Sequence, residues 1–358
     1  MLDVTTGQSA PSSTAAQMPG RTFFGVGNRN YTLTLDTNPT GQSIKLAVAR
    51  INASGGTQVI STEDLTTPVT RVYNPAVTGE GLYIVVAFST SGALIEFSKV
   101  SVLASAQLPN TSFSVVLHLA GDFFTALTTA EAQQLTTNLL TSANARLGQA
   151  GIQVNVGASS FRRLTTNSIK AQDSSLVTVG GNTYLDGTNT DSQTRRWGAL
   201  GIPASDATFG KALDVFLVEA DQGIPGYTAV DTAIRGTIFT GAGSAHCVVV
   251  AYADRVGGAR TTSELGYIIA HEISHALGLA HTTDPSLAFD PIPDTPHGVK
   301  SDYDTNSNGV FGSEEASPAH PDYSNLLYPY VGSGGTTPGL LTAHQGAVMR
   351  SYLAVQEH

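Results

Sequence analysis

The chain has 358 residues, of which 41% are hydrophobic and 13% are charged, and its formal net charge is −10. This length exceeds that of an average domain, so we expect two globular units. The acidic excess and the lack of clustered Lys and Arg exclude nucleic acid as an expected partner, and no apolar run approaches the roughly 20 residues that a transmembrane helix needs.

Residues 1–20 are predicted to be a disordered linker, because Ser, Thr, Ala, Pro, Gly and Gln dominate them. They contain neither the basic nor the apolar region of a secretory signal. Charged residues are scarce in the whole chain and uncharged polar residues are abundant, which is typical of exported bacterial proteins. We therefore expect a secreted, cell-surface or periplasmic protein whose signal segment has been removed.

Residues 21–106 are predicted to form a small all-β sandwich. Short segments rich in β-branched and aromatic residues recur there, bounded by Gly, Asn, Pro or Ser, as is typical of strands joined by turns. This part of the chain contains no His and few carboxylates, so we expect an accessory role. The predicted strands are 31–36, 43–51, 57–62, 81–89 and 93–103.

The pattern changes near residues 108–110, and residues 107–358 are predicted to form a second domain. A strand at 112–121, a long helix at 126–151 and a terminal helix at 340–355 frame it, with a weakly periodic surface excursion at 165–210. This order predicts a mixed sheet covered by helices, so the whole chain is α+β. The single cysteine, Cys247, is expected to be buried in a strand and cannot form an internal disulfide. The other predicted strands are 152–159, 212–220, 232–240 and 245–253.

The segment 261–281, TTSELGYIIAHEISHALGLAH, carries the chemistry. Thr261 and Glu264 form a capping-box pattern that begins a helix. His271 and His275 are four residues apart, so they project from one face of that helix and can bind one Zn²⁺ ion together. Glu272 lies beside them, where a general base is needed.

A catalytic zinc ion needs a third protein ligand and one open position. Gly278 can adopt the positive φ that ends a helix, and the chain can then return His281 to the metal. An amphipathic core helix that carries histidines by chance is the alternative interpretation. Five positions have separate geometric roles, and this favours the metal site over that alternative. They are His271, Glu272, His275, Gly278 and His281.

HEISHALGLAHTTD resembles the extended zinc motif of the metzincin metallopeptidases and most resembles that of the matrixins, the matrix-metalloproteinase group. The resemblance is strong over residues 261–281 and extends over 110–358. It implies a mostly parallel twisted sheet with an active-site helix and a C-terminal helix. It also implies that a zinc-bound water hydrolyses peptide bonds of protein or peptide substrates, which dock antiparallel to the edge strand 232–240.

Metzincins also carry a tight turn beneath the zinc, usually centred on Met. SNLLYPYV (324–331) resembles this turn, with Leu327 at the Met position, and Leu has a similar apolar volume. In this register Tyr328, Pro329 and Tyr330 resemble the matrixin wall of the S1′ pocket. An alternative register places Leu326 at the Met position and makes Tyr328 resemble the tyrosine that reaches zinc in some other metzincins.

A second cation site is predicted between His281 and this turn. DTNSNGVFGSEE (304–315) matches an EF-hand-type loop, with a glycine at its sixth position. A structural Ca²⁺ ion there would stiffen the insertion, whereas the alternative is a solvated loop without an ion. The predicted calcium ligands are Asp304, Asn306, Asn308, the carbonyl group of Val310, and Glu315.

The sequence thus predicts a secreted zinc endopeptidase in which His271, His275 and His281 bind the metal and Glu272 acts as general base. One alternative is a binding or adhesion protein with a residual metal site, although such a site does not need Glu272. Another is a zymogen held inactive by residues 21–106. The sequence does not predict the oligomeric state.

Overall fold

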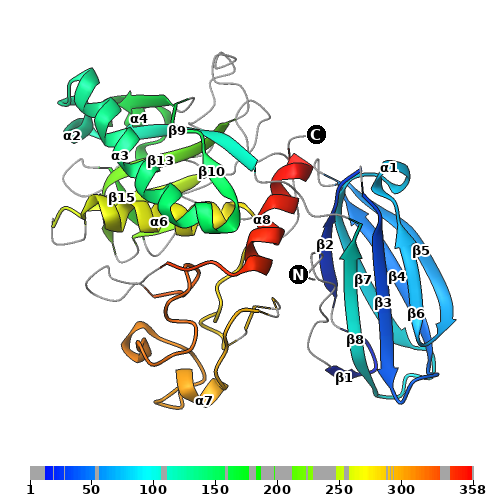
Figure 1. Ribbon diagram of the computed structural model, residues 1–358. Helices are drawn as coiled ribbons and strands as arrows, with labels where there is room; N and C mark the ends of the chain where they lie inside the picture. The colour runs from blue at the N-terminus through cyan, green and yellow to red at the C-terminus, as the bar shows by residue number, and fades with distance from the viewer. Residues whose placement is uncertain are drawn as a thin grey trace.

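The computed structural model describes residues 13–18, 20–27, 29–52, 56–105, 111–157, 160–176, 183–186, 197, 212–222, 225–228, 247–253, 258–287, 289–290, 292, 294–330 and 339–356. Over these ranges the protein is mixed α+β, with three sheets and few helices (Figure 1). None of the described helices is both long enough and apolar enough to cross a membrane.

The N-terminal part consists of two four-stranded antiparallel sheets, in the orders β1-β8-β3-β6 and β2-β7-β4-β5. Inward-facing residues of both sheets form one buried cluster, to which Leu33 and Leu46 belong, as expected of a sandwich. A short helix, α1 (Pro75–Thr78), precedes β7. The strands are β1 (Ser13–Ala15), β2 (Arg21–Gly25), β3 (Tyr31–Asn38), β4 (Ser43–Ile51), β5 (Thr57–Thr66), β6 (Val69–Tyr73), β7 (Gly81–Ser89) and β8 (Ile95–Ala104).

The five strands expected in this region correspond to β3, β4, β5, β7 and β8. The structure differs at the start, where Ser13–Ala15 pairs with β8 and Met18 is completely buried. Part of the segment expected to be a disordered linker therefore belongs to the sandwich, because its backbone completes a sheet edge. Residues 1–12 lie outside the described ranges. β2 and β6 were not expected, since each has only five residues.

The second part is built on a sheet in the order β10-β9-β13-β15-β14, with β11 paired to β9 and β12 to β13. Its strands pair in parallel except β14, which is antiparallel to β15. The strands are β9 (Thr111–Ala120), β10 (Ile152–Val154), β11 (Ser160–Leu164), β12 (Tyr184–Asp186), β13 (Ala212–Gln222), β14 (Gly226–Thr228) and β15 (Val248–Ala253).

Each face of this sheet is buried against a different set of elements. Leu117 and Val215 lie on the face that packs against helices α3 (Thr129–Leu147) and α6 (Thr262–Ala276). Phe216 and Cys247 lie in the cluster of the other face, which Trp197 and Ile169 cover. The helix α8 (Ala343–Gln356) lies between the sandwich and the rest of the second part (Figure 1). Within the described ranges, the other helices are α2 (Asp122–Thr125), α4 (Thr166–Gln172), α7 (Lys300–Tyr303) and the 3₁₀ turns η1 (Gly148–Ala150), η2 (Ser174–Leu176) and η4 (Ser313–Glu315).

Most of the elements that the sequence predicts for this part lie within a few residues of their predicted positions. The expected strand 152–159 is shorter in the structure, where β10 ends at Val154, and a further strand, β11, begins at Ser160; both pair with β9. The excursion at 165–210 contains α4 and β12 within its described residues, so part of it is regular. The strand expected at 232–240 lies outside the described residues. In the sheet of the second part, the antiparallel strand that the structure describes is β14.

Close packing against α3 fixes the position of α6. Gly266 of α6 faces Ser142 of α3, and a Cβ atom at Gly266 would collide with the Ser142 side chain and approach its carbonyl carbon to 3.0 Å. The two backbones can approach this closely only because residue 266 has no side chain.

We expect Gly266→Ala to lower the free energy of unfolding by about 1–3 kcal/mol, the usual cost of overpacking a core. An exposed helix would instead gain ~1 kcal/mol from the same change. Gly148→Ala is the matched control, because a Cβ there meets nothing within 4 Å. Urea denaturation followed by circular dichroism measures both variants, and equal midpoints would contradict the close contact.

Candidate metal centre

Helix α6 begins at a complete capping box. The Thr261 hydroxyl accepts from the Glu264 N–H at 3.2 Å, and the Glu264 carboxylate accepts from the Thr261 N–H at 2.7 Å. These two bonds satisfy N–H groups that a helix start otherwise leaves without partners. The apolar side of the helix, including Leu265, Ile269 and Ile273, is buried in the core. The capping box and the buried apolar side together fix how α6 is oriented, and therefore the direction in which His271 and His275 project.

Gly278 reverses the chain after α6. Its φ is +88°, a left-handed conformation that favours glycine. The Leu279 N–H donates to the Ser274 carbonyl group at 3.1 Å, which ties the turn to the end of the helix. The chain then carries His281 back toward the two histidines of the helix, as the spacing of the motif predicted.

The Nε2 atoms of the three histidines converge. The Nε2 of His271 lies 3.1 Å from that of His275 and 3.3 Å from that of His281. Ligands at roughly 2.05 Å from a tetrahedral centre lie about 3.3 Å apart, so these separations fit a zinc ion. Among the described residues, this is the group of His, Cys, Asp and Glu side chains that could hold a metal.

Hydrogen bonds on the far side of the rings determine which nitrogens face the centre. The Nδ1 of His271 donates to the Leu326 carbonyl oxygen at 2.6 Å, and the Nδ1 of His275 donates to the Leu279 carbonyl oxygen at 2.8 Å. A carbonyl oxygen only accepts, so both Nδ1 atoms carry the proton and, in neutral rings, both Nε2 atoms present lone pairs. Two lone pairs 3.1 Å apart repel each other unless a cation lies between them.

Burial keeps these rings neutral. It lowers the pKa of His271 well below its ordinary value, with a further contribution from His275 and His281. Burial also lowers the pKa of His275, and it lowers that of His281 to about 3. Neutral imidazole is the form that binds metal, so a cation does not have to compete with protons near neutral pH.

Glu272 is also buried, and burial raises the pKa of its carboxyl group to about 8. The Thr228 hydroxyl of β14 lies 2.8 Å from both the Oε2 and the carbonyl oxygen of Glu272. The hydroxyl can donate to an ionised Glu272, or accept from a protonated Glu272 while donating to the carbonyl group. A Cβ at Gly226 would lie 2.9 Å from the Glu272 Oε1. β14 therefore confines this carboxyl group in either protonation state.

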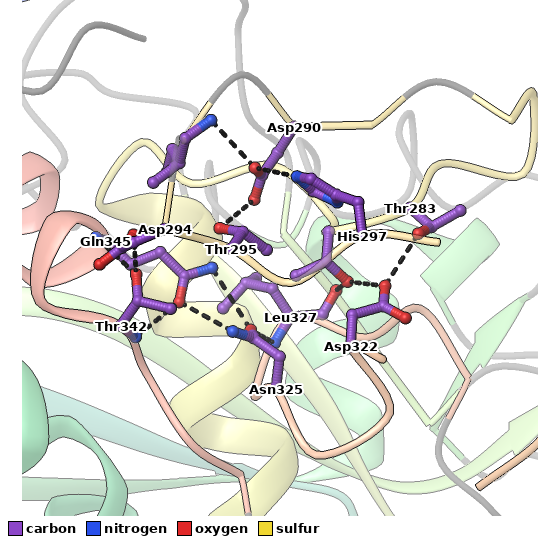
Figure 2. Close-up of polar contacts among 12 residues, drawn as sticks. Thr283, Asp290, Asp294, Thr295, His297, Asp322, Asn325, Leu327, Thr342 and Gln345 are labelled. Atoms are coloured by element: carbon purple, nitrogen blue, oxygen red, sulfur yellow. Dashed lines mark hydrogen bonds and ion pairs between the residues drawn. The ribbon is translucent and has the colours of Figure 1, made fainter. Parts of the chain in front are cut away.

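The turn at 324–330 supports the first histidine through its backbone. The Leu326 carbonyl oxygen accepts from His271 and also from the Tyr267 hydroxyl at 3.1 Å. Leu326 and Leu327 are both fully buried and belong to the main apolar core. Asn325 anchors the turn by donating to the Gln345 side chain at 3.0 Å and accepting from the Leu327 N–H at 2.9 Å (Figure 2).

Asp322 ties three segments together and was not expected from the sequence. Its fully buried carboxylate accepts from the hydroxyls of Thr282 at 2.6 Å, Thr283 at 2.8 Å and Tyr303 at 2.7 Å (Figure 2 shows Thr283). Burial and the bond to Asp322 raise the pKa of Tyr303 to about 12, so its hydroxyl remains a donor. Thr282 directly follows His281, hence this cluster fixes the chain next to the third histidine.

The turn tyrosines are placed differently from the expected pocket wall. Tyr328 is fully buried, and its hydroxyl contacts the Nδ1 of His320 at 2.8 Å. It therefore does not line an open pocket, because its ring packs in the core of the insertion. Pro329 and Tyr330 are half-buried, and the Tyr330 hydroxyl donates to the Phe311 carbonyl oxygen at 2.6 Å.

The expected calcium loop adopts a tightly bonded conformation. The Asp304 carboxylate accepts from the N–H groups of Asn308 at 2.9 Å and Gly309 at 3.0 Å, and Gly309 has a φ of +84°. The Asn308 side chain accepts from the Val310 N–H at 2.9 Å, and the Asn306 side chain from the Asn308 N–H at 3.0 Å. Glu315 returns to the loop and accepts from the Asn306 N–H at 3.1 Å. The loop thus brings the five expected ligand residues into one turn.

Comparisons with known proteins show only distant similarity. No protein-family model and no curated protein matches the chain. Metalloproteinase-II from Bacteroides fragilis is 12% identical with a TM-score of 0.25, over 57% of this chain and 58% of that chain. A family two carbohydrate esterase from Cellvibrio japonicus is 10% identical with a TM-score of 0.19, over 75% of this chain and 90% of that chain. Scores this low do not establish a shared fold.

We expect Asp322→Ala to lower the free energy of unfolding by about 3 kcal/mol, because it leaves three buried hydroxyls without their acceptor. Asp322→Asn should cost less, since the amide oxygen still accepts. Glu314→Ala, at an exposed carboxylate of the same insertion, should change the value by less than ~0.5 kcal/mol. Chemical denaturation measures all three, and an Asp322→Ala value near that of the control would contradict the role of the cluster.

Proposed function

We propose that the protein is an exported zinc endopeptidase with a metzincin-type catalytic unit. One observation carries the proposal: the Nε2 atoms of His271 and His275 lie 3.1 Å apart while both Nδ1 atoms donate to carbonyl groups. A cation between these nitrogens would offset the repulsion of their lone pairs, and a third imidazole nitrogen lies at tetrahedral separation from the first. Three imidazoles with one remaining position are a typical ligand set of catalytic zinc.

The chain supplies the other group that peptide hydrolysis needs. A zinc ion held by the three histidines would supply Lewis acidity and water of lowered pKa. Glu272, next in sequence to the first ligand, takes up the proton of the attacking water and passes it to the leaving amine. The Thr228 hydroxyl accommodates both protonation states of Glu272, as a residue that gains and loses a proton in each cycle requires.

The arrangement of the second part supports the metzincin assignment. Its sheet is mostly parallel with an antiparallel strand, β14, and a helix that carries two of the three histidines and a C-terminal helix accompany it. Protein or peptide substrates would add a strand at the edge of such a sheet through backbone hydrogen bonds. In this proposal the peptide runs antiparallel to the strand expected at 232–240.

Zinc content and activity should separate in matched variants. The wild-type protein should bind stoichiometric zinc and cleave an unfolded protein substrate, and His275→Ala should lose both. Glu272→Gln should keep the zinc and lose at least about a hundredfold in rate, because general acid–base catalysis contributes that much.

Elemental analysis and a fluorogenic cleavage assay measure these two quantities. Glu264→Gln is the control on the same helix, since Gln retains a capping oxygen outside the metal site. A Glu272→Gln variant with wild-type turnover would show that another group is the base. A zinc-loaded wild-type protein without any hydrolytic activity would favour the binding-protein alternative.

We also propose that the loop at 304–315 binds a structural Ca²⁺ ion through Asp304, Asn306, Asn308, the Val310 carbonyl group and Glu315. What supports this is the network of hydrogen bonds that links these residues within the loop and the packing of the loop's only aromatic residue. Phe311 is buried, and its ring lies 5.1 Å from that of Tyr330 and 5.9 Å from that of Tyr328. An ion in the loop would therefore stiffen the insertion up to the turn below the histidines.

Calcium at about 100 times its dissociation constant should stabilise the zinc-loaded protein by ~2.7 kcal/mol, seen as a higher Tm by differential scanning calorimetry. Glu315→Gln should greatly reduce this shift, because the twelfth position of such a loop supplies both oxygens of a carboxylate. Glu314→Gln, one residue earlier and exposed, should keep the shift. Identical Tm values with calcium and with a calcium-specific chelator would contradict the site.

A further inference from the structure

We propose that the N-terminal β-sandwich is a positioning element of the metal centre, with Phe24 of β2 buttressing the Gly278 turn that delivers His281. The sandwich then belongs to the working protein, in contrast to the alternative of an inhibitory segment that is removed. The effect on metal binding rests on the proposed function, whereas the support of the turn does not.

The contact is made by two aromatic rings on opposite sides of the interface. Phe24 is 1% exposed, and its ring meets that of Tyr352 of α8 edge-on, with centroids 4.9 Å apart and planes at 87°. Both rings lie against Gly278: a Cβ atom there would lie 3.0 Å from Tyr352 Cδ2 and 3.5 Å from Phe24 Cε2. The turn is thus enclosed by one ring from the sandwich and one from the terminal helix.

The apolar core is continuous across this interface. Phe24, Val26, Ile51 and Leu82 of the sandwich belong to the same buried cluster as Leu277 and Leu279 beside the turn, and Met349 and Leu353 of α8. Figure 1 shows α8 between the sandwich and the rest of the second part. Loss of the sandwich would expose this surface to water, at a cost of roughly 25 cal/mol per Å² of apolar area.

Strand β2 faces both cores. Phe23 packs within the sandwich, where its ring stacks on Tyr83 at 5.0 Å and lies 5.3 Å from Tyr31. Phe24 points the opposite way because side chains alternate along a strand. Phe23 therefore stabilises the sandwich internally, whereas Phe24 makes its contact with the turn.

This contact matters for the metal because His281 is the only one of the three histidines outside a helix. The positions of metal ligands must hold within about 0.5 Å, which requires support from packed neighbours. The N–H groups of Gly278 and Leu279 donate to His275 and Ser274 at 2.9 and 3.1 Å, and the Thr282 N–H donates to Leu327 at 3.0 Å. Packing by Phe24 adds an apolar support at Gly278 itself.

Hydrogen–deuterium exchange on the full-length, metal-free protein tests the support of the turn. In Phe24→Ala we expect the amides of Leu279 and Thr282 to exchange about tenfold faster or more, through local opening. Amides in α3 should keep their wild-type rates. In zinc-loaded protein the same variant should release zinc to a chromophoric chelator about tenfold faster. Phe24→Leu, which keeps most of the apolar volume, should restore both rates in large part.

Val72→Ala is the control, since Val72 is 62% exposed on the sandwich, and it should leave both rates unchanged. Wild-type exchange at Leu279 and Thr282 in Phe24→Ala would overturn the proposal. Uniformly faster exchange across all elements, in Phe24→Ala and Phe24→Leu alike, would also overturn it, because it would indicate global destabilisation alone. If the wild type retained no zinc while the localised exchange effect appeared, the support of the turn would stand and the zinc function would fail.

Discussion

The structure of the site depends on hydrogen bonds that point away from it. The imidazoles of His271 and His275 each donate from Nδ1 to a backbone carbonyl group, and this fixes their Nε2 lone pairs toward a common centre. The acceptors belong to the turn at Leu326 and to the bend at Leu279, which are far apart from each other in the sequence. The ligand geometry is therefore a property of how helix, bend and turn pack together.

The same packing holds the third histidine, His281, through two separate contacts. Asp322 binds the hydroxyls of Thr282 and Thr283 immediately after His281, while the rings of Phe24 and Tyr352 enclose the bend before it. One support is polar and buried, and the other is apolar and comes from the N-terminal sandwich. A chain segment without regular secondary structure can hold a ligand in place only when it is fixed on both sides.

Local patterns predicted that the three histidines converge, but not which residues support them. The histidine spacing, the capping box and Gly278 can be recognised in the sequence because helix periodicity and positive φ are local properties. Asp322 and Thr228 act across 40 and 44 residues, so nothing adjacent to them signals their partners. A buried acid among hydroxyl residues could have drawn attention to Asp322. The tyrosine at 328 was expected at a pocket, but the core of the insertion buries it.

X-ray absorption spectroscopy at the zinc edge tests the central claim most directly, because it measures the ligands around the ion itself. Three imidazole nitrogens and one further light atom at about 2.0–2.1 Å would agree with convergence of the three Nε2 atoms. A sulfur ligand, an all-oxygen shell, or only one or two imidazoles around the ion would contradict it. In that case the observed arrangement of the rings would not describe a zinc site.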